Sequence, residues 1–132
     1  MKMKVVSVIL ACAVASMGLV TSAHAAAIVN GATCANKGTT TSVKVKGVNK
    51  VYSCAVNPTA VSGAPATWVL KNCLSYWNSA LEQQSNIAQQ QALVNVMTEP
   101  DRSKYNAQLK SSQAQLDKVK AAIKINWCKA GL

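Results

Sequence analysis

The cysteines are the residues of this 132-residue chain best suited to chemistry, because a thiol can act as a nucleophile, bind a metal or form a crosslink. Four of the five lie beyond an N-terminal hydrophobic leader, at Cys34, Cys54, Cys73 and Cys128. A catalytic thiolate usually needs a base such as histidine, and the only histidine, His24, falls within that leader. The four positions also lack the close CxxC spacing typical of structural zinc sites. Disulfide bonds are therefore the favoured interpretation.

Residues 1–25 are predicted to be a cleaved secretory signal peptide. Two lysines precede an apolar run from residue 5 to residue 20, and Ala23 and Ala25 provide the small residues that a cleavage site needs. The run is short for a membrane-spanning helix, which needs about 20 residues, and no second candidate follows. We therefore expect a periplasmic or secreted protein with no stable transmembrane segment after cleavage.

Two alternatives to this leader stay open. The hydrophobic run could be retained as an anchor. Cys12, at the end of the stretch ILAC, could instead become a lipidated first residue, although the apolar run continues beyond it where a polar tether is expected.

The predicted mature chain is strongly basic. Loss of Lys2 and Lys4 leaves twelve of the fourteen Lys and Arg residues against all four Asp and Glu residues, which is a net charge of +8. The remaining length of about 107 residues suits one small domain, a size at which crosslinks often reinforce the core. An even number of cysteines in such an exported chain is normally a disulfide framework.

The mature chain divides into three segments. Residues 26–57 are rich in valine, threonine and glycine and carry turn signals, which predicts a small antiparallel β lobe. Residues 58–66 collect prolines, a glycine and small residues, as a connector does. Residues 67–132 change to a helical period and are predicted to form an antiparallel hairpin. The expected fold is α+β, a small N-terminal antiparallel β meander followed by a long disulfide-stapled α-helical hairpin.

One stretch of the predicted β lobe alternates strictly. In SVKVKG, Val43 and Val45 fall on one face of a strand, and Lys44 and Lys46 fall on the other. We expect the valine face to be buried and the lysine face to be cationic and wet.

The two predicted helices carry apolar seams that suit packing along each other, as in a coiled coil. In the second helix the seam positions recur at spacings of four and three, at Tyr105, Leu109, Ser112, Leu116, Val119, Ile123 and then Asn126 or Trp127. The first helix has a broader stripe, made of Leu70, Cys73, Leu74, Trp77, Leu81, Ile87, Ala88 and Val94. Thr98 is predicted to cap the second helix, with Pro100 in its first turn and Asp101 completing a capping box.

The hairpin geometry predicts the disulfide pairs. If the turn lies near residues 98–100, facing residues have numbers that add to about 200, and those of Cys73 and Cys128 add to 201. A bridge there would clamp the open end of the hairpin, and the chain-entropy model gives it about 4 kcal/mol. Cys34 then pairs with Cys54 by elimination, while two bridges joining the lobes remain the alternative.

No catalytic apparatus is recognisable in the mature chain. It contains no nucleophile elbow, SxxK motif, glycine-rich phosphate loop or HExxH helix. Its four carboxylates show no acid and base couple for glycoside hydrolysis. A serine and lysine pair assembled only in space would be invisible in the sequence. We expect a protein that is not an enzyme, with no cofactor and no metal.

Basic side chains are the feature that best indicates a function. We predict a binding surface that includes Lys44 and Lys46 of the β lobe and Lys118, Lys120 and Lys124 of the second helix. The alternative is a solvated lysine face that keeps the protein soluble. Outside the cytoplasm the partner would be a protein or an anionic envelope surface. Nucleic acid is not expected, because lysine greatly outnumbers the single arginine and no reading motif is present.

The three tryptophans allow two interpretations. Trp77 and Trp127 lie near the predicted Cys73–Cys128 bridge, and Trp68 stands just before the first helix. We expect them to pack in the core around that bridge. The alternative is an aromatic cluster that binds a partner, because a two-helix rod cannot bury its whole apolar stripe without the β lobe, a second copy or a partner.

The predicted architecture resembles the basic periplasmic chaperones of the Skp type, which hold outer-membrane proteins with long helical hairpins projecting from a small β body. The likeness rests on the basic charge, the signal peptide, the stretch IVN and the hairpin, whereas four cysteines and a short chain depart from that pattern. It implies a chaperone or envelope-structural protein that forms homo-oligomers through the hairpin. The residues themselves favour a small basic exported adaptor or inhibitor module that acts through protein–protein contacts.

Overall fold

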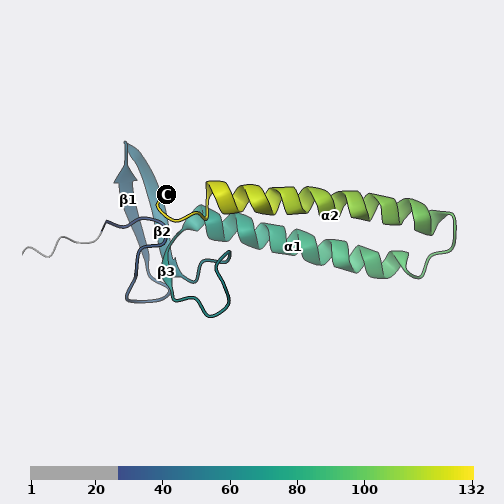
Figure 1. Cartoon of the computed structure of the whole chain (residues 1–132), viewed down its shortest axis with the longest axis horizontal. Helices are drawn as coiled ribbons and strands as arrows, with labels where there is room; N and C mark the ends of the chain where they lie inside the picture. Colours follow the sequence, from purple (N-terminus) through teal and green to yellow (C-terminus); the bar gives the residue numbers. More distant parts are fainter. Residues whose placement is uncertain (1–26) are drawn as a thin grey trace, which may run out of the picture.

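The computed structural model describes residues 27–132, so the predicted signal peptide and Cys12 lie outside the described residues. A three-stranded antiparallel sheet in the order β1-β2-β3 is followed by two helices. The sheet stands at one end, and the helices project from it side by side as a rod (Figure 1). The fold is α+β, and it has the predicted order of a β meander followed by a disulfide-linked helical hairpin.

β1 (Thr40–Val45) and β2 (Val48–Ala55) form a tight hairpin. The two residues of its turn, Lys46 and Gly47, both have positive φ, at 49° and 81°. This is the backbone of a type I′ turn, whose twist matches that of the flanking strands and which glycine adopts without strain. Lys46 therefore lies in the turn, and not on the solvent face of a strand as predicted.

The alternation predicted for β1 is confirmed. Val43 and Val45 are half-buried, whereas Lys44 between them is exposed. Val43 packs against the hydrophobic core, so this face of the sheet is the one that meets the helices.

β3 (Thr67–Leu70) pairs with the second half of β2. The sequence placed these residues at the start of the helical hairpin, but they are a strand because both of their edges are hydrogen-bonded. On the side away from β2, the Trp68 N–H donates to the Ala32 carbonyl, and the Trp68 carbonyl accepts from the Gly31 N–H, both at 2.8 Å. Pairing with a distant segment thus overrides the local helical period.

α1 (Lys71–Val94) and α2 (Asp101–Asn126) form the predicted antiparallel hairpin. The buried side chains of α2 are seven residues apart, at Leu109, Leu116 and Ile123. Tyr105 and Val119, which we placed on the same seam, are 41% and 50% exposed, because a single partner helix covers only a narrow stripe. Among residues 27–132, neither helix is long and apolar enough to cross a membrane.

The predicted capping box at the start of α2 is wrong. Pro100 precedes the helix and offers no side-chain cap. The Glu99 carboxylate takes this role, because it accepts hydrogen bonds from the Ser103 hydroxyl at 2.6 Å and the Ser103 N–H at 3.2 Å. The hydroxyl bond lowers the pKa of Glu99, and the second bond and the Arg102 charge act in the same direction.

Both predicted disulfides are present. Cys73 and Cys128, with Cα atoms 5.0 Å apart, join the first turn of α1 to the residues that follow α2. Cys34 and Cys54, with Cα atoms 5.8 Å apart, tie the segment before β1 to the end of β2. Each bridge therefore closes its own part of the fold, and the crossed pairing does not occur.

The buried side chain of Asn30 connects three segments of the chain. Its amide group donates to the main-chain carbonyl groups of Trp127 at 3.1 Å and Lys129 at 2.8 Å. Its amide oxygen accepts a hydrogen bond from the Leu70 N–H at 2.9 Å. The side chain thus fixes the end of β3 against the turn that follows α2.

Main-chain hydrogen bonds complete this junction. The Asn30 N–H donates to the Leu132 carbonyl at 3.1 Å, and the Gly131 N–H donates to the Asn30 carbonyl at 2.7 Å. The Tyr52 hydroxyl also donates to the Leu132 carbonyl, at 3.0 Å, and burial of the ring raises the pKa of this hydroxyl. The last residues of the chain are therefore part of the core of the β lobe.

We predict that Asn30→Ala lowers the free energy of unfolding by about 3 kcal/mol, because it strands two carbonyl groups and one N–H in a largely buried junction. Chemical denaturation of the disulfide-bonded protein measures the loss. Asn78→Ala, on the exposed face of α1, is the matched control and should change stability by less than about 0.5 kcal/mol. Equal effects of the two substitutions would contradict a structural role for Asn30.

Candidate functional site

An open cleft lies beside β2 at the point where β3 turns into α1. β3 pairs only with the second half of β2, so within the described chain Val48–Val51 has β1 on one side and no strand on the other. A cavity of about 360 Å³ opens along this free edge. We call it the root cleft. Its remaining walls are Leu70, Lys71 and Asn72 at the junction of β3 and α1, and Asn126, Trp127 and Leu132 at the C-terminal end.

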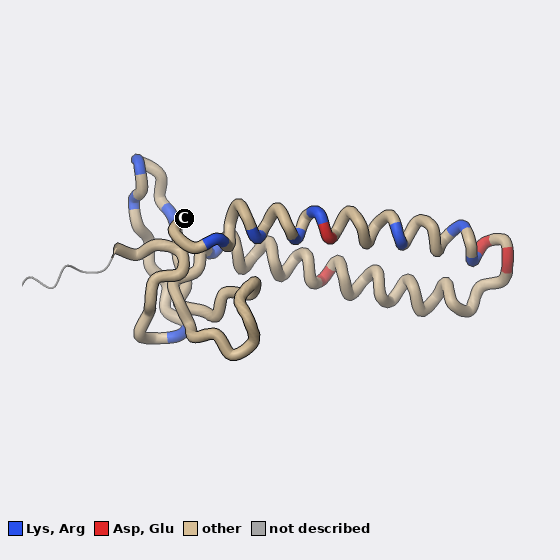
Figure 2. The backbone as a smooth tube through the Cα atoms, in the orientation of Figure 1, with Lys and Arg blue, Asp and Glu red and all other residues tan. Residues whose placement is uncertain are grey.

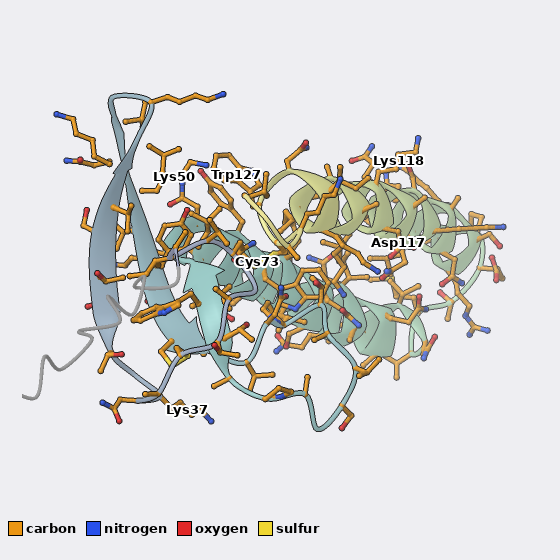
Figure 3. The ribbon with its side chains drawn as sticks, turned by 60° about the vertical axis from the view of Figure 1, so that its left-hand side comes forward. Lys37, Lys50, Cys73, Asp117, Lys118 and Trp127 are labelled. Carbon is orange, nitrogen blue, oxygen red and sulfur yellow. A yellow bond between two sulfur atoms is a disulfide. The ribbon has the colours of Figure 1, made fainter. Side chains whose placement is uncertain are left out.

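Trp127 is the aromatic side chain of the root cleft. It is 37% exposed, and it stands edge-on to Tyr76 of α1 with the ring centroids 5.3 Å apart. Its main chain is anchored, because its carbonyl accepts a hydrogen bond from Asn30 and its neighbour Cys128 is crosslinked. Figure 3 shows Trp127 next to Lys50, between the sheet and the end of α2. A rigid, partly exposed tryptophan of this kind is typical of binding anchors.

The other two tryptophans behave as the core interpretation predicted. Trp68 and Trp77 are half-buried and pack against the hydrophobic core around Tyr52 and Cys73. Trp127 therefore separates from them as the exposed member of the group, and Val48 and Val51 of the root cleft, 63% and 39% exposed, extend its apolar surface.

The root cleft is also basic. Lys50 and Lys71 line it, and no carboxylate side chain is among its described walls. Lys44 and Lys46 carry the positive charge on to the tip of the β hairpin. Figure 2 shows basic residues at this tip and along the rod, and acidic residues on the rod alone. The cleft therefore favours ligands that combine negative charge with apolar groups.

The structure does not gather the five predicted binding lysines into one surface. Lys44 and Lys46 lie on the β hairpin, and Lys118 is exposed on the rod. Lys120 is half-buried, with its ammonium 5.4 Å from the centre of the Trp77 ring and bonded to a glutamine of α1. Successive helical residues differ by about 100° around the axis, so Lys118 and Lys120 face in nearly opposite directions.

Lys124 belongs to a separate cavity of about 370 Å³, which it shares with Lys129 and Asn57. The Asn57 amide donates to the Cys128 carbonyl at 2.8 Å, so this site also adjoins the clamped end of the hairpin. A binding role for the five lysines stays a prediction, and only Lys44 and Lys46 are near the root cleft along the same strand pair.

Besides a small cavity of about 140 Å³, two further cavities lie along the rod. The larger, about 570 Å³, is a groove between the helices lined mainly by glutamine and other polar residues, and the Gln91 amide donates to Asn106 across it at 2.8 Å. The other, about 310 Å³, lies near the tip beside Leu93, Met97 and Tyr105. Neither contains lysine and tryptophan together, so the root cleft is the better candidate for a specific site.

All four described cysteines, Cys34, Cys54, Cys73 and Cys128, are joined in disulfides. Between residues 27 and 132, no group of three or more His, Cys, Asp or Glu side chains could hold a metal ion. That the protein is not an enzyme stays a prediction.

Sequence reasoning missed most of the root cleft. Val48, Val51 and Lys71 carry no motif, and their proximity to Trp127 follows only from the end of β3 at Leu70. One feature of the sequence could have helped. The two-residue turn before Val48 determines which residues of β2 direct their main-chain groups toward β1 and which direct them to the opposite edge. Comparisons with protein-family models, curated proteins and solved structures gave no significant match to this chain.

We predict that Cys73→Ser combined with Cys128→Ser costs about 4 kcal/mol of stability, because the bridge closes a loop of 55 residues. The same change should broaden the indole N–H resonance of Trp127 in NMR spectra, because the wall of the cleft loses its clamp. Cys34→Ser combined with Cys54→Ser is the control, with an expected cost of about 3 kcal/mol for its loop of 20 residues and an unchanged Trp127 signal. If the line width of the Trp127 indole resonance is the same in both double variants as in the unmodified protein, the Cys73–Cys128 bridge does not order the cleft.

Proposed function

We propose that this protein is a small basic exported module without catalytic activity, an adaptor or inhibitor, that binds a protein partner through the root cleft. The observation that carries the proposal is the partly exposed Trp127, held rigid next to Lys50 and Lys71. Aromatic anchors on a rigid scaffold lose little conformational entropy on binding, and lysines around them attract a partner of opposite charge.

Export is part of this proposal. The two disulfides are compatible with an oxidising compartment, and the predicted leader of residues 1–25 would direct the chain to the periplasm or the exterior. The partner would then be another envelope or extracellular protein, or an anionic envelope surface.

A photo-crosslinking experiment tests the site. We expect p-benzoylphenylalanine at position 51, in the root cleft, to give one defined protein adduct in intact native cells. The same probe at position 118, exposed on the rod, should not give this adduct. An adduct from position 118 alone, or none from position 51, would count against the root cleft as the contact surface.

The purified partner allows an electrostatic test. We predict that Lys50→Glu with Lys71→Glu slows association about tenfold at low salt, because both charges lie where the partner docks. Lys37→Glu with Lys118→Glu makes the same change in net charge away from the cleft and should have a smaller effect. Stopped-flow or surface binding at several salt concentrations measures both. Equal slowing by the two pairs would mean that net charge matters and the cleft does not.

The exposed apolar side chains of the rod favour a second function. Leu81, Leu93, Val96, Val119 and Ile125 are between 45% and 82% exposed. A chaperone or envelope-structural protein of the Skp-like kind would cover them by forming homo-oligomers or by holding an unfolded client.

Size in solution separates the two functions. A binding module should be monomeric in light scattering at micromolar concentration. A trimer or larger assembly that Val119→Glu disperses, and that Lys118→Glu does not, would support the oligomeric alternative. Suppression of the aggregation of an unfolded outer-membrane protein at stoichiometric concentration would support it further.

A further inference from the structure

The free edge of β2 presents main-chain groups to the root cleft. In a hairpin with a two-residue turn, the residues that flank the turn form a hydrogen-bonded pair, and such pairs recur at every second residue. Lys50 therefore directs its N–H and C=O toward β1. Asn49 and Val51 direct theirs to the opposite edge, in the same phase as Ser53, which lies opposite Val69 of β3.

These outward groups are unpaired within the described residues 27–132. β3 has ended at Leu70, opposite Tyr52, and no other hydrogen bond joins the main chain of Asn49 or Val51 to the protein. Both residues are exposed. The other edge of β3 is different, because residues 31–33 pair with it. An edge that stays open is a template for another strand.

We infer that the root cleft binds an extended acidic segment of a partner protein, which adds to β2 as a strand in line with β3. This inference rests on the proposed binding function and specifies its partner. A segment antiparallel to β2 would exchange four hydrogen bonds, two with Asn49 and two with Val51. The available edge of four residues, Val48–Val51, is about 13 Å long, so the segment needs four or five residues.

The register of β2 sets the side chains that this segment should carry. Residues directly opposite each other on neighbouring strands have Cβ atoms about 5 Å apart, so the residue opposite Lys50 should be acidic. The residues opposite Val51 and Val48 should be apolar, because both valines are exposed in the free protein. Read from the end nearest β3, the preferred order is apolar, acidic, polar, apolar.

Charge argues against a second copy as the occupant. The β hairpin that a second copy could offer carries Lys44 and Lys50 on its strands and Lys46 in its turn, and it has no acidic residue. Pairing these strands with the root cleft would bring like charges opposite each other, which destabilises a sheet. The outer edge of β1 is also free, but the exposed Lys44 protects it.

A short peptide tests strand addition directly. The probe is acetyl-Thr-Val-Glu-Thr-Val-Glu-amide, whose second to fifth residues match the preferred order. We expect millimolar or tighter binding to the 15N-labelled protein, with shifts of the Asn49 and Val51 amide signals and little change at Ser42 and Lys44 on the other edge. No binding at 5 mM peptide, or shifts at Ser42 and Lys44 instead, would overturn the inference.

N-methylation distinguishes strand pairing from other binding. Methylating the second and fourth peptide nitrogens removes the donors that face β2 and should weaken binding at least tenfold. Methylating the third and fifth nitrogens changes the outward edge of the peptide and should weaken it less than threefold. Equal weakening by both methylation patterns would show that the peptide does not bind through main-chain hydrogen bonds to β2.

Proline substitution makes the matching change in the protein. Asn49→Pro removes one N–H that faces the cleft and spares the bonds to β1, so peptide affinity should fall at least tenfold. Ser42→Pro removes an outward N–H from β1 and should change affinity less than twofold. Retention of both disulfides and of the Tyr52 core signals confirms that each variant is folded. If a variant does not fold, the peptide-induced shifts of the unmodified protein still test the inference.

The two proposals fail in different ways. If a partner crosslinks at position 51 and binds the Asn49→Pro variant with unchanged affinity, the proposed binding function is supported and strand addition is contradicted. A peptide that binds as expected, with no crosslinked partner in cells, would remove the proposed function. A dimer of the protein that Asn49→Pro dissociates would make a second copy the occupant and overturn the inference.

Discussion

One buried amide sets the arrangement of the whole molecule. Asn30 is the buried polar residue of the described chain, and its donors and acceptor are all matched by main-chain groups. Because a buried amide that loses its partners is costly, the end of β3 and the turn after α2 cannot move apart independently. Leu70 and Trp127, whose main-chain groups Asn30 binds, both line the root cleft. The shape of the cleft is therefore a consequence of a polar contact made in the core behind it.

Local patterns and covalent constraints were enough to predict much of this fold. The antiparallel numbering placed Cys73 opposite Cys128, and the alternation at Val43 and Val45 identified β1. Prediction failed where distant segments compete with local preference. Thr67–Leu70 could begin a helix by its own period, but it is a strand because Ala32 and Gly31 pair with its outer edge. No property of the segment itself reveals that pairing.

The candidate site was harder to predict than the fold for a related reason. Lysine positions along α2 can be read from the sequence, but the half-buried place of Lys120 against Trp77 depends on the neighbouring helix. The exposure of Trp127 depends on how the chain turns after α2 to meet Asn30. The sequence shows the type of each side chain, but the root cleft forms only where β2, the junction of β3 and α1, and the C-terminal end lie next to one another. That arrangement cannot be predicted from any one of these segments.

The uneven placement of charge gives the molecule an electric polarity along its axis. The β lobe contains Lys37, Lys44, Lys46 and Lys50 without an acid, while Glu82, Glu99, Asp101 and Asp117 all lie on the rod. The rod is about 36 Å long, several times the screening length of about 8 Å at physiological salt. A negatively charged surface therefore acts mainly on the part of the molecule nearest to it, and the distal end of the rod, where Glu99 and Asp101 balance Arg102 and Lys104, offers it no net charge. The four unopposed lysines give the sheet end the stronger attraction of the two.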